Sequence, residues 1–398
     1  MDTWEFISKN EKANVKDLAL QAKKYPQVDM PFAIDQIAGL QTARLKLPSY
    51  AAISGLHYPH HLSMEQCSSE STAAYKAHLV ESHSSPSERN FFADLTAGFG
   101  VDFSFIAQLF KQADYVERQA YLCELAQHNF PLLGLSQVSI HNIDGLQYLE
   151  QMQTVDWLFL DPARRDKNGG KVVSISDCEP DVAKLEDTLL QKAHNVLIKL
   201  SPMLDISLAI HTLKHVREVH VVATNNECKE LLFWLSRATI PTIEILIYSY
   251  NQQKKEQLFS FTLAEEEQAC ASYTSTIGKY LYEPNAALIK SGGFKSICTQ
   301  FGLQKLHPNS HLYTSDNLQD KFPGRVFQVE RVCGFSKKEL KELQQLKQAN
   351  LTTRNFPQSV QELRKRLKLS DGGTHYLFAT TLQNGDKVLI DCLKSFIS

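Results

Sequence analysis

The chain has 398 residues, of which 43% are hydrophobic, 22% charged and 10% aromatic. This is the composition of a globular protein, and it excludes disordered and fibrous classes. The longest stretch without Lys, Arg, Asp or Glu, residues 47–64, contains two prolines and three histidines and cannot form a membrane-spanning helix. The net charge of −2 conceals an asymmetry, because residues 279–398 carry 18 Lys and Arg against 10 Asp and Glu. A basic tail on an acidic body favours a partner with negative charge, although a solvated surface would also account for it.

The N-terminus is charged from its second residue and has no apolar segment followed by a cleavage site, so we expect no secretory signal and a cytoplasmic protein. The eight cysteines lie at least 28 residues apart. This spacing excludes a CxxC zinc or redox pair and a compact disulfide framework. His57, His60 and His61 have no cysteine beside them, and we predict no metal site.

Residues 1–88 are predicted to be mostly helical. Apolar residues recur at helical spacing in residues 15–25 and 32–47, and a further helix fits residues 70–81. Residues 82–90, SHSSPSERN, form a linker of small and turn-forming residues.

From Phe91 onward, short apolar runs alternate with helical segments. The predicted strands are residues 91–95, 114–118, 138–144, 155–161 and 195–201, with helices over 103–111, 121–134 and 182–193. This alternation indicates βαβ units and a parallel sheet with helices on both faces. We expect the sheet to be completed by a strand over 216–226, a helix over 227–237 and strands over 243–250 and 257–263.

A third region follows the acidic segment AEEEQA. Helices are predicted over 284–292, 294–302, 336–349 and 358–370, and strands over 325–332, 375–382 and 387–393. Asn384-Gly385 between the last two strands is a strong hairpin signal. The expected organisation is therefore a helical region (1–88), an α/β domain (89–270) and a small α+β domain (276–398).

Candidate chemistry gathers where the predicted strands end. In FFADLTAGFGVD (91–102) a strand leads directly into a loop with Gly98 and Gly100, which let the backbone approach a ligand, although a plain strand-to-helix turn would look the same. An acid stands at the end of each of four consecutive strands, namely Asp94, Glu117, Asp144 and Asp161. Ligands of open α/β sheets bind at this carboxyl edge, and an acid about twenty residues after the glycine loop can accept both hydroxyls of a ribose.

This arrangement resembles the class I S-adenosylmethionine-dependent methyltransferases, with a Rossmann-like sheet, over about residues 89–265. The resemblance implies that the glycine loop holds the methionine end of the cofactor, the second acid holds the ribose and the third contacts the adenine amine. The cofactor-binding residues expected from it are Asp94, Thr96, Gly98, Gly100, Asp102, Glu117, Arg118, Asp144, Gly145 and Asp161.

The whole chain is similar to a bacterial group of these enzymes that carries a THUMP-like C-terminal domain. The motifs that carry this similarity are DLTAGFGVD (94–102), DPARRD (161–166), IKLSPMLD (198–205), FPGR (322–325) and RNFP (354–357). The stretch ELAQHNFPLLGL (124–135) also matches a helix found in RNA-modifying members. The resemblance therefore implies S-adenosyl-L-methionine as cofactor and favours RNA as the substrate.

The motif Asp161-Pro162-Ala163-Arg164 departs from the Asp/Asn-Pro-Pro-aromatic motif of enzymes that methylate a base amine. The acid and the carbonyl of Pro162 remain as acceptors for an amine, but the aromatic platform is missing, and only Arg164 could stack on a base or bind a phosphate. Carbon-5 methylation of a pyrimidine requires a cysteine nucleophile. The corresponding loop, Lys199-Leu200-Ser201-Pro202, has none, and Cys178 is a remote substitute, so we reject this route.

Basic residues provide the candidate substrate contacts. Arg164, Arg165 and Lys167 beside Asp161 could clamp an anionic substrate, or form a solvated loop. Lys199 could act on a phosphate or carboxylate, or extend from the strand end to solvent. In the tail, Arg354, Arg364 and Arg366 could contact RNA, or belong to a solvated helix face. Before the first strand, Gln66, Ser69 and Glu70 could cap the cofactor pocket, and a helix N-cap at Ser69 or Ser71 is the alternative.

The sequence thus predicts a cytoplasmic methyltransferase in which Asp161, Pro162, Arg164 and Lys199 serve catalysis, with RNA as the favoured substrate and without a metal or membrane partner. Two alternatives remain. The enzyme could methylate a small molecule or a protein, or the fold could serve as a catalytically silent RNA-binding scaffold.

Overall fold

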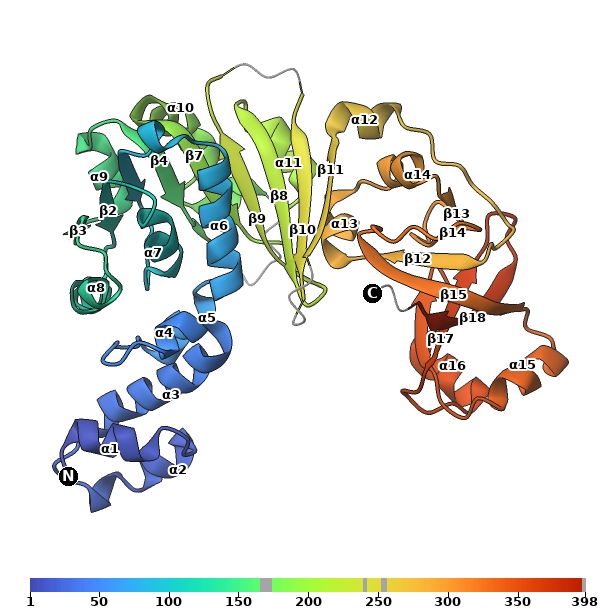
Figure 1. Cartoon of the computed structure of the whole chain (residues 1–398), viewed down its shortest axis with the longest axis horizontal. Helices are drawn as coiled ribbons and strands as arrows, with labels where there is room; N and C mark the ends of the chain where they lie inside the picture. The colour runs from blue at the N-terminus through green and yellow to red at the C-terminus, as the bar shows by residue number, and fades with distance from the viewer. Residues whose placement is uncertain (165–173, 239–241, 252–255, 396–398) are drawn as a thin grey trace. The chain divides into compact units, whose positions relative to one another are not determined.

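The computed structural model describes the chain except for residues 165–173, 239–241, 252–255 and 396–398 (Figure 1). The chain divides into two compact units. The first consists of residues 1–216 and 233–239, and the second of residues 217–232 and 240–398.

The first unit begins with the predicted helical region. Its helices are α1 (Thr3–Asn10), α2 (Val15–Leu20), η1 (Ala22–Lys24), α3 (Met30–Lys46), α4 (Pro48–Ala51), α5 (His61–Gln66) and α6 (Glu70–Ser82), followed by η2 (Pro86–Glu88). Polar caps start several of them, because a side-chain oxygen at the N-cap satisfies a backbone N–H that lacks a helical partner. Asp2, Asn14, Asp29 and Ser69 all accept such bonds.

A buried apolar cluster joins this helical region to the glycine loop. It contains Leu47, Tyr50 and Met64 of the helical region together with Phe99 and Val101 of the loop and the following helix. The helical region is thus part of the structure that supports the predicted cofactor loop.

The predicted parallel sheet is confirmed. Its strands in the first unit are β1 (Phe91–Asp94), β2 (Gln112–Val116), β3 (Val138–His141), β4 (Val155–Leu160) and β7 (Ala193–Leu200). Their order is β7-β4-β1-β2-β3, and each neighbouring pair is parallel. In chain order this is the 3-2-1-4-5 arrangement of a doubly wound fold, in which the ligand crevice opens where the order reverses, between β1 and β4.

Helices connect these strands, and those over residues 145–151 and 206–212 were not predicted from the sequence. They are α7 (Val101–Ala107), α8 (Ala120–Leu132), α9 (Gly145–Gln151), α10 (Val182–Lys192) and α11 (Ile206–Thr212). After β4 the chain also forms the short antiparallel pair β5 (Ala163–Arg164) and β6 (Cys178–Glu179), with η3 (Ile175–Asp177) before β6.

The helix predicted over residues 227–237 is wrong, because the chain forms strand β9 (Glu227–Leu235) there. Asn225 and Asn226, which follow β8 (Val216–Thr224), have φ of 52° and 61°. Two consecutive positive φ values are typical of a two-residue type I′ hairpin turn, which reverses the chain. The apolar run 231–235 then suits a strand buried on both faces, and β9 stands between β7 and β8 in the sheet order.

In the second unit, β10 (Glu244–Tyr250) pairs parallel to β8 and antiparallel to β11 (Glu256–Thr262), as predicted for two further strands. Helix α12 (Leu263–Gln268) follows.

The predicted small α+β module follows in the same unit. Its sheet has the order β13-β14-β12-β15-β18-β17-β16. The strands are β12 (Tyr280–Pro284), β13 (Gln304–Lys305), β14 (Tyr313–Ser315), β15 (Gly324–Cys333), β16 (Asn350–Arg354), β17 (His375–Thr381) and β18 (Lys387–Lys394). The helices are α13 (Ala286–Ser291), α14 (Ser296–Phe301), α15 (Lys337–Gln344) and α16 (Val360–Leu367). The predicted hairpin is confirmed, since β17 and β18 are antiparallel and Gly385 in their turn has a φ of +90°.

Candidate active site

The candidate site lies at the carboxyl ends of β1 and β4, which are parallel neighbours. β1 ends at Asp94, and Asp161 directly follows β4, so both acids stand at this edge of the sheet. Thr96 joins the two loops. Its Oγ1 accepts a hydrogen bond from the backbone N of Asp161 at 2.6 Å, and its own N donates to Oδ1 of Asp94 at 2.9 Å.

The glycine loop is held in place by the next strand. Gly98 and Gly100 have φ of +58° and +81°, a conformation that other residues adopt only with strain. The N of Gly98 donates to Oε2 of Glu117 at 3.0 Å, and the hydroxyl of Tyr115 donates to the Gly98 carbonyl. A Cβ at Gly98 would have no neighbour closer than 3.9 Å, so the backbone of the loop is open on that side.

The second acid, Glu117, follows β2 and is 8% exposed. In addition to the bond from Gly98, its Oε1 accepts a hydrogen bond from the N of Gln119 at 2.8 Å. Each carboxylate oxygen has a second lone pair, so the side chain retains acceptor capacity for two ligand hydroxyls. Arg118, which follows it, is exposed.

The third acid, Asp144, is the N-cap of α9, and its Oδ1 accepts a hydrogen bond from the N of Leu146 at 2.9 Å. Gly145 has a packing role, because a Cβ there would lie 2.3 Å from the carbonyl oxygen of Leu95 in the loop after β1. Glycine at this position therefore lets α9 begin directly against the candidate site.

Asp102, which the sequence analysis assigned to the cofactor, lies in a buried ion pair. Nζ of Lys76 on α6 is 2.9 Å from its Oδ1, and the hydroxyl of Ser68 donates to its Oδ2 at 2.7 Å. Burial alone would raise the pKa of Asp102, but the ammonium groups of Lys76 and Lys199 lower it below its usual value. Neither Lys76 nor Ser68 could be recognised from the sequence, since a lysine within a helical segment ordinarily indicates a solvated face.

Ser69, which the sequence placed either at the cofactor pocket or at a helix N-cap, is the N-cap of α6. Its side chain accepts a hydrogen bond from the N of Thr72 at 3.3 Å. Oε2 of Glu70 accepts from the N of Ser49 at 2.7 Å, and Gln66 is exposed. The residue of this segment that reaches the site is Ser68.

Asp161 and Lys199 form an ion pair across the strand ends. Lys199 lies near the end of β7, the parallel neighbour of β4, and its Nζ is 2.5 Å from Oδ2 of Asp161. The Asp161 side chain is 40% exposed and that of Lys199 14% exposed. An accessible carboxylate with a nearly buried ammonium behind it is suited to contact a ligand in a fixed orientation.

Asp94 shows what kind of ligand fits this edge. It is buried, and among the described residues its Oδ2 has no hydrogen-bond partner. Burial raises the pKa of Asp94 well above its ordinary value. The hydrogen bond from the N of Thr96 lowers the pKa, whereas the negative charges of Asp102, Asp161 and Glu117 raise it further. A cationic ligand group beside Asp94 would compensate this burial. The open glycine loop, the remaining capacity of Glu117 and this unpartnered oxygen fit a ligand that combines positive charge with a ribose.

Comparison with known proteins agrees with this chemistry. Residues 280–323 match a family model described as a ferredoxin-like domain, and residues 324–394 match one described as THUMP domain-like. The chain is 38% identical to a candidate methyltransferase of Porphyromonas gingivalis W83 with a known crystal structure, with a TM-score of 0.85 and 99% of each chain covered. The protein belongs to this family of S-adenosylmethionine-dependent methyltransferases with a THUMP-like C-terminal domain.

More distant relatives carry the same cofactor in their names. Two strains of Mycobacterium tuberculosis, CDC 1551 / Oshkosh and H37Rv, have an uncharacterized S-adenosylmethionine-dependent methyltransferase that is 22% identical over 279 residues. The match covers 69% of this chain and 73% of theirs. The cofactor of the methyltransferase is therefore S-adenosyl-L-methionine.

Beyond Asp161, Pro162 is buried and Ala163–Arg164 forms β5, opposite Cys178 and Glu179 of β6. Cys178 itself is 3% exposed. The side chain of Arg164 and the whole of Arg165 and Lys167 lie outside the described residues of the methyltransferase.

The three arginines proposed for RNA contact have different surroundings. Nη2 of Arg354 is 2.8 Å from Oε1 of Glu283, which is 3% exposed, so Arg354 neutralises a buried acid. Arg364 pairs with the exposed Asp371. Arg366, by contrast, lies over an aromatic ring, with its guanidinium carbon 5.2 Å from the centre of Phe335.

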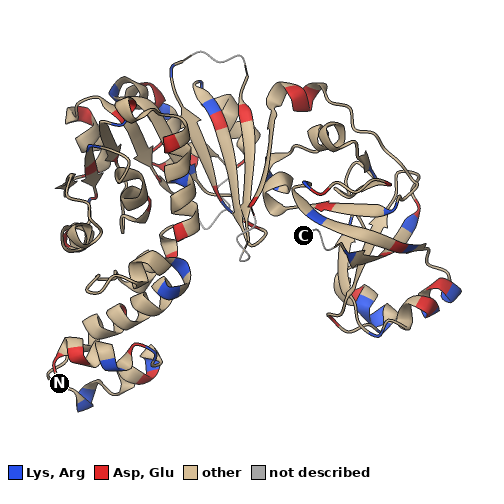
Figure 2. Ribbon diagram, viewed as in Figure 1, with Lys and Arg blue, Asp and Glu red and all other residues tan. Residues whose placement is uncertain are grey.

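Arg366 belongs to a cavity of about 370 Å³ that the sequence analysis missed. It is lined by Phe335, Phe356, Pro357, Gln358, Arg366 and Lys387. The two phenylalanine rings are stacked at 5.3 Å, and Arg366 Nη1 donates to Oε1 of Gln358 at 3.3 Å. Basic residues mark α16, which carries Arg364, Lys365 and Arg366 in its last turn against one acid, Glu362, in its first (Figure 2). We refer to these six residues as the aromatic-arginine cavity.

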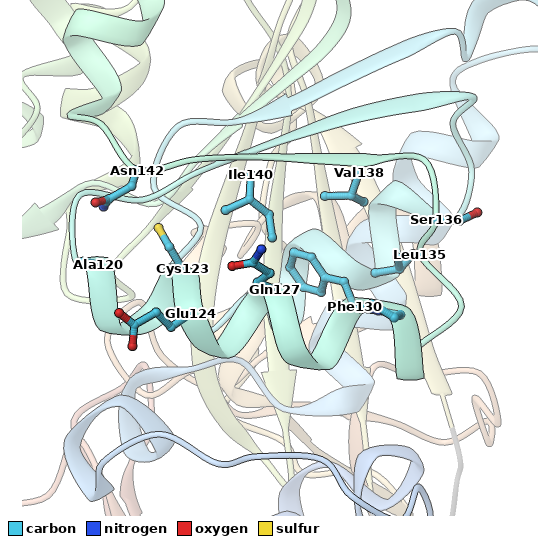
Figure 3. A pocket seen from close by; sticks show the side chains of 11 residues that line it. Ala120, Cys123, Glu124, Gln127, Phe130, Leu135, Ser136, Val138, Ile140 and Asn142 are labelled. Atoms are coloured by element: carbon cyan, nitrogen blue, oxygen red, sulfur yellow. The ribbon is translucent and has the colours of Figure 1, made fainter.

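A larger cavity of about 620 Å³ lies between α8 and β3 (Figure 3). None of the four acids of the candidate site lines it. Two lining residues, Cys123 and Asn142, donate to the backbone carbonyl of Glu117 at 3.3 and 2.9 Å, so this cavity adjoins the second acid.

The described residues contain no group of three or more His, Cys, Asp or Glu that could hold a metal ion. Within the same part of the chain, no helix is long and apolar enough to cross a membrane.

Proposed function

We propose that this methyltransferase transfers a methyl group from S-adenosylmethionine to RNA in the cytoplasm. On this proposal residues 1–88 support the site, residues 89–270 bind the cofactor and carry out the transfer, and residues 276–398 recognise the RNA. The observation that carries the choice of RNA is the aromatic-arginine cavity within the THUMP-like match. It combines two partly buried phenylalanines with Arg366 and Lys387 at its exposed rim.

Such a cavity has the chemistry that single-stranded RNA requires. Unpaired bases stack on aromatic rings and on guanidinium planes, while lysine and arginine at the rim contact phosphates. The Gln358 side chain adds an amide that can bond a base edge. Arg354 and Arg364 supply additional positive charge, although each is paired within the module.

The bound cofactor supplies a methyl group on a reactive sulfonium centre. For its binding, we assign the methionine end to Asp94, Thr96, Gly98 and Gly100, the ribose to Glu117 with Arg118, and the adenine amine to Asp144 with Gly145. Asp102 does not contact the cofactor in this assignment and acts through Lys199, whose Nζ lies 3.7 Å from its Oδ2. This donor needs no metal or covalent intermediate, so alignment of donor and acceptor is the main task of the protein.

At the acceptor, Asp161 and the carbonyl of Pro162 orient the nucleophilic atom. As that atom bonds to the methyl group it acquires positive charge, which the Asp161 carboxylate stabilises. Lys199, 2.5 Å from Asp161, holds the carboxylate in one orientation. Arg164, Arg165 and Lys167 are proposed to clamp the phosphates next to the target nucleotide.

The test is transfer of labelled methyl from S-adenosylmethionine to total RNA from cells that lack this gene, with protein and small-molecule fractions in parallel. We expect label in one RNA size class, and a reduction in Phe335→Ala, which retains the complete candidate active site. Label confined to the protein or small-molecule fraction would refute RNA as the substrate.

A further inference from the structure

Four charged side chains of alternating sign run from the helical region to the candidate site. They are Lys76 on α6, Asp102 on α7, Lys199 on β7 and Asp161 after β4. Lys76 Nζ is 2.9 Å from Asp102 Oδ1, Lys199 Nζ is 3.7 Å from Asp102 Oδ2, and the same Nζ is 2.5 Å from Asp161 Oδ2. All four residues belong to the first unit.

The ion pair between Lys76 and Asp102 is buried. Lys76 is 0% exposed and Asp102 is 9% exposed. A buried ion pair gains little net stability, because the desolvation of both charges offsets their attraction, and apolar residues of similar volume often stabilise a protein equally well. Ser68 completes the pair, since its hydroxyl donates to Asp102 at 2.7 Å and Lys76 Nζ lies 3.2 Å from the same hydroxyl.

Lys199 lies between two carboxylates and is closer to Asp161. The distances of 2.5 Å and 3.7 Å differ because Asp102 already receives a charge and a hydroxyl from Lys76 and Ser68. If Lys76 lost its charge, Asp102 would be a buried anion that needs a cation, and Lys199 is within reach. Lys199 would then be drawn away from Asp161.

We propose that Lys76, with Ser68 and Asp102, is a positioning residue of methyl transfer, which keeps Lys199 on Asp161 and thereby fixes the carboxylate that faces the acceptor. This inference rests on the proposed function, in which Asp161 faces the acceptor and RNA is the methylated molecule. It gives the helical region a function beyond packing, because α6 and the residue before its N-cap deliver the charge and the hydroxyl that complete the candidate site.

The experiment compares Lys76→Met with the double variant Lys76→Met/Asp102→Asn in the full-length protein. Three readouts are used: crystal structures, S-adenosylmethionine affinity by calorimetry, and the single-turnover rate of methyl transfer to total RNA from cells lacking the gene. Lys46→Met is the matched control, because Lys46 lies in the same helical region and its Nζ donates to the backbone carbonyls of Met64 and Glu65, at 2.9 and 2.7 Å. Asp161→Ala is measured alongside.

In Lys76→Met we expect Lys199 to move from Asp161 to Asp102 and the transfer rate to fall about 10- to 100-fold, the loss that a misplaced group of this kind produces. Cofactor affinity should remain within about threefold of wild type, because the positioning acts on the acceptor side. The double variant removes both buried charges, so Lys199 should return to Asp161 and the rate should rise above that of Lys76→Met.

An unchanged Lys199–Asp161 pair with a wild-type rate in Lys76→Met would overturn the inference, as would a folded, cofactor-binding double variant no faster than the single one. If Lys76→Met does not fold, Ser68→Ala takes its place, because it removes the hydroxyl that donates to Asp102 at 2.7 Å; an unchanged Lys199–Asp161 pair with a wild-type rate there would overturn the inference. Asp161→Ala separates two failures. A wild-type transfer rate in Asp161→Ala refutes the proposed function of Asp161. A reduced transfer rate in Asp161→Ala together with a wild-type rate in Lys76→Met refutes the role of Lys76 alone.

Discussion

Replacement of Glu117 by Gln tests the assignment of the cofactor site with little change in shape. In the structure Oε2 accepts from the N of Gly98 at 3.0 Å and Oε1 accepts from the N of Gln119 at 2.8 Å. A glutamine has one acceptor oxygen and one NH₂ group, so one of the two backbone donors would face another donor. The variant must therefore release either the glycine loop or the start of α8.

The expected magnitude follows from these bonds. A hydrogen bond to a charged group contributes about 1.5–3 kcal/mol. Loss of one such bond to the loop, together with the weaker acceptor for the ribose hydroxyls, should reduce the binding free energy of S-adenosylmethionine by about 2–4 kcal/mol. Since 1.4 kcal/mol corresponds to a tenfold change, the dissociation constant should rise by roughly 30- to 1000-fold.

Isothermal titration calorimetry with S-adenosylmethionine measures this change directly. Glu124→Gln is the matched control, because Glu124 is an exposed residue of the same helix α8 and lines the cavity of Figure 3 rather than the candidate site. Circular dichroism confirms that both variants are folded. Binding by folded Glu117→Gln within threefold of wild type would refute the assignment of the ribose to this acid.

Four further predictions address other parts of the structure. Gly145→Ala places a Cβ 2.3 Å from the Leu95 carbonyl and should destabilise the protein by about 1–3 kcal/mol in chemical unfolding, with neighbouring Leu146→Ala as the control; an unchanged midpoint would contradict the contact. Because the folded pKa of Asp94 is raised, the folded state binds the proton more tightly than the unfolded state, so stability without cofactor falls as pH rises above the ordinary value of 3.8. Asp94→Asn should therefore raise the melting temperature at pH 7 more than at a pH near 3.8, while it weakens cofactor binding, and equal shifts at both pH values would be inconsistent with a raised pKa. Phe335→Ala should weaken binding of single-stranded RNA by about 1–3 kcal/mol, and Arg366→Ala should reduce its salt dependence, in fluorescence anisotropy against Lys338→Ala as a control on the neighbouring helix; equal affinities would remove the cavity from RNA recognition. Arg354→Ala should instead lower the melting temperature, because it leaves the buried Glu283 with one arginine fewer, and unchanged stability would contradict this structural role.

The sequence predicts the strand ends well because hydrophobic pattern and chemistry coincide there. Asp94, Glu117 and Asp161 each terminate or directly follow an apolar run, and the structure places all three at the carboxyl edge of the parallel strands. Asp144, three residues after β3, takes the additional task of an N-cap. A short apolar run and an acid at its end are local features, which a sequence shows directly.

What the sequence does not show depends on contacts between distant segments. The apolar run of β9 has the composition of a buried helix as much as that of a central strand, and only the Asn225-Asn226 turn before it favours a hairpin. Lys76 was predicted only to lie in a helix over residues 70–81, because its partner Asp102 lies 26 residues away in the sequence. Arg354 looked available for RNA because the acid that binds it, Glu283, is 71 residues distant.

The central claim is that methyl transfer takes place at the carboxyl edge of β1 and β4, with Asp161 facing the acceptor. The most direct test measures, in wild type and Asp161→Ala, both the affinity for S-adenosylmethionine and the single-turnover transfer of its labelled methyl group to RNA from cells lacking the gene. We predict affinities within about threefold of each other and a transfer rate reduced by about 100-fold or more in the variant. Equal transfer rates in the two proteins would contradict the account, because the acceptor would then be oriented by other residues.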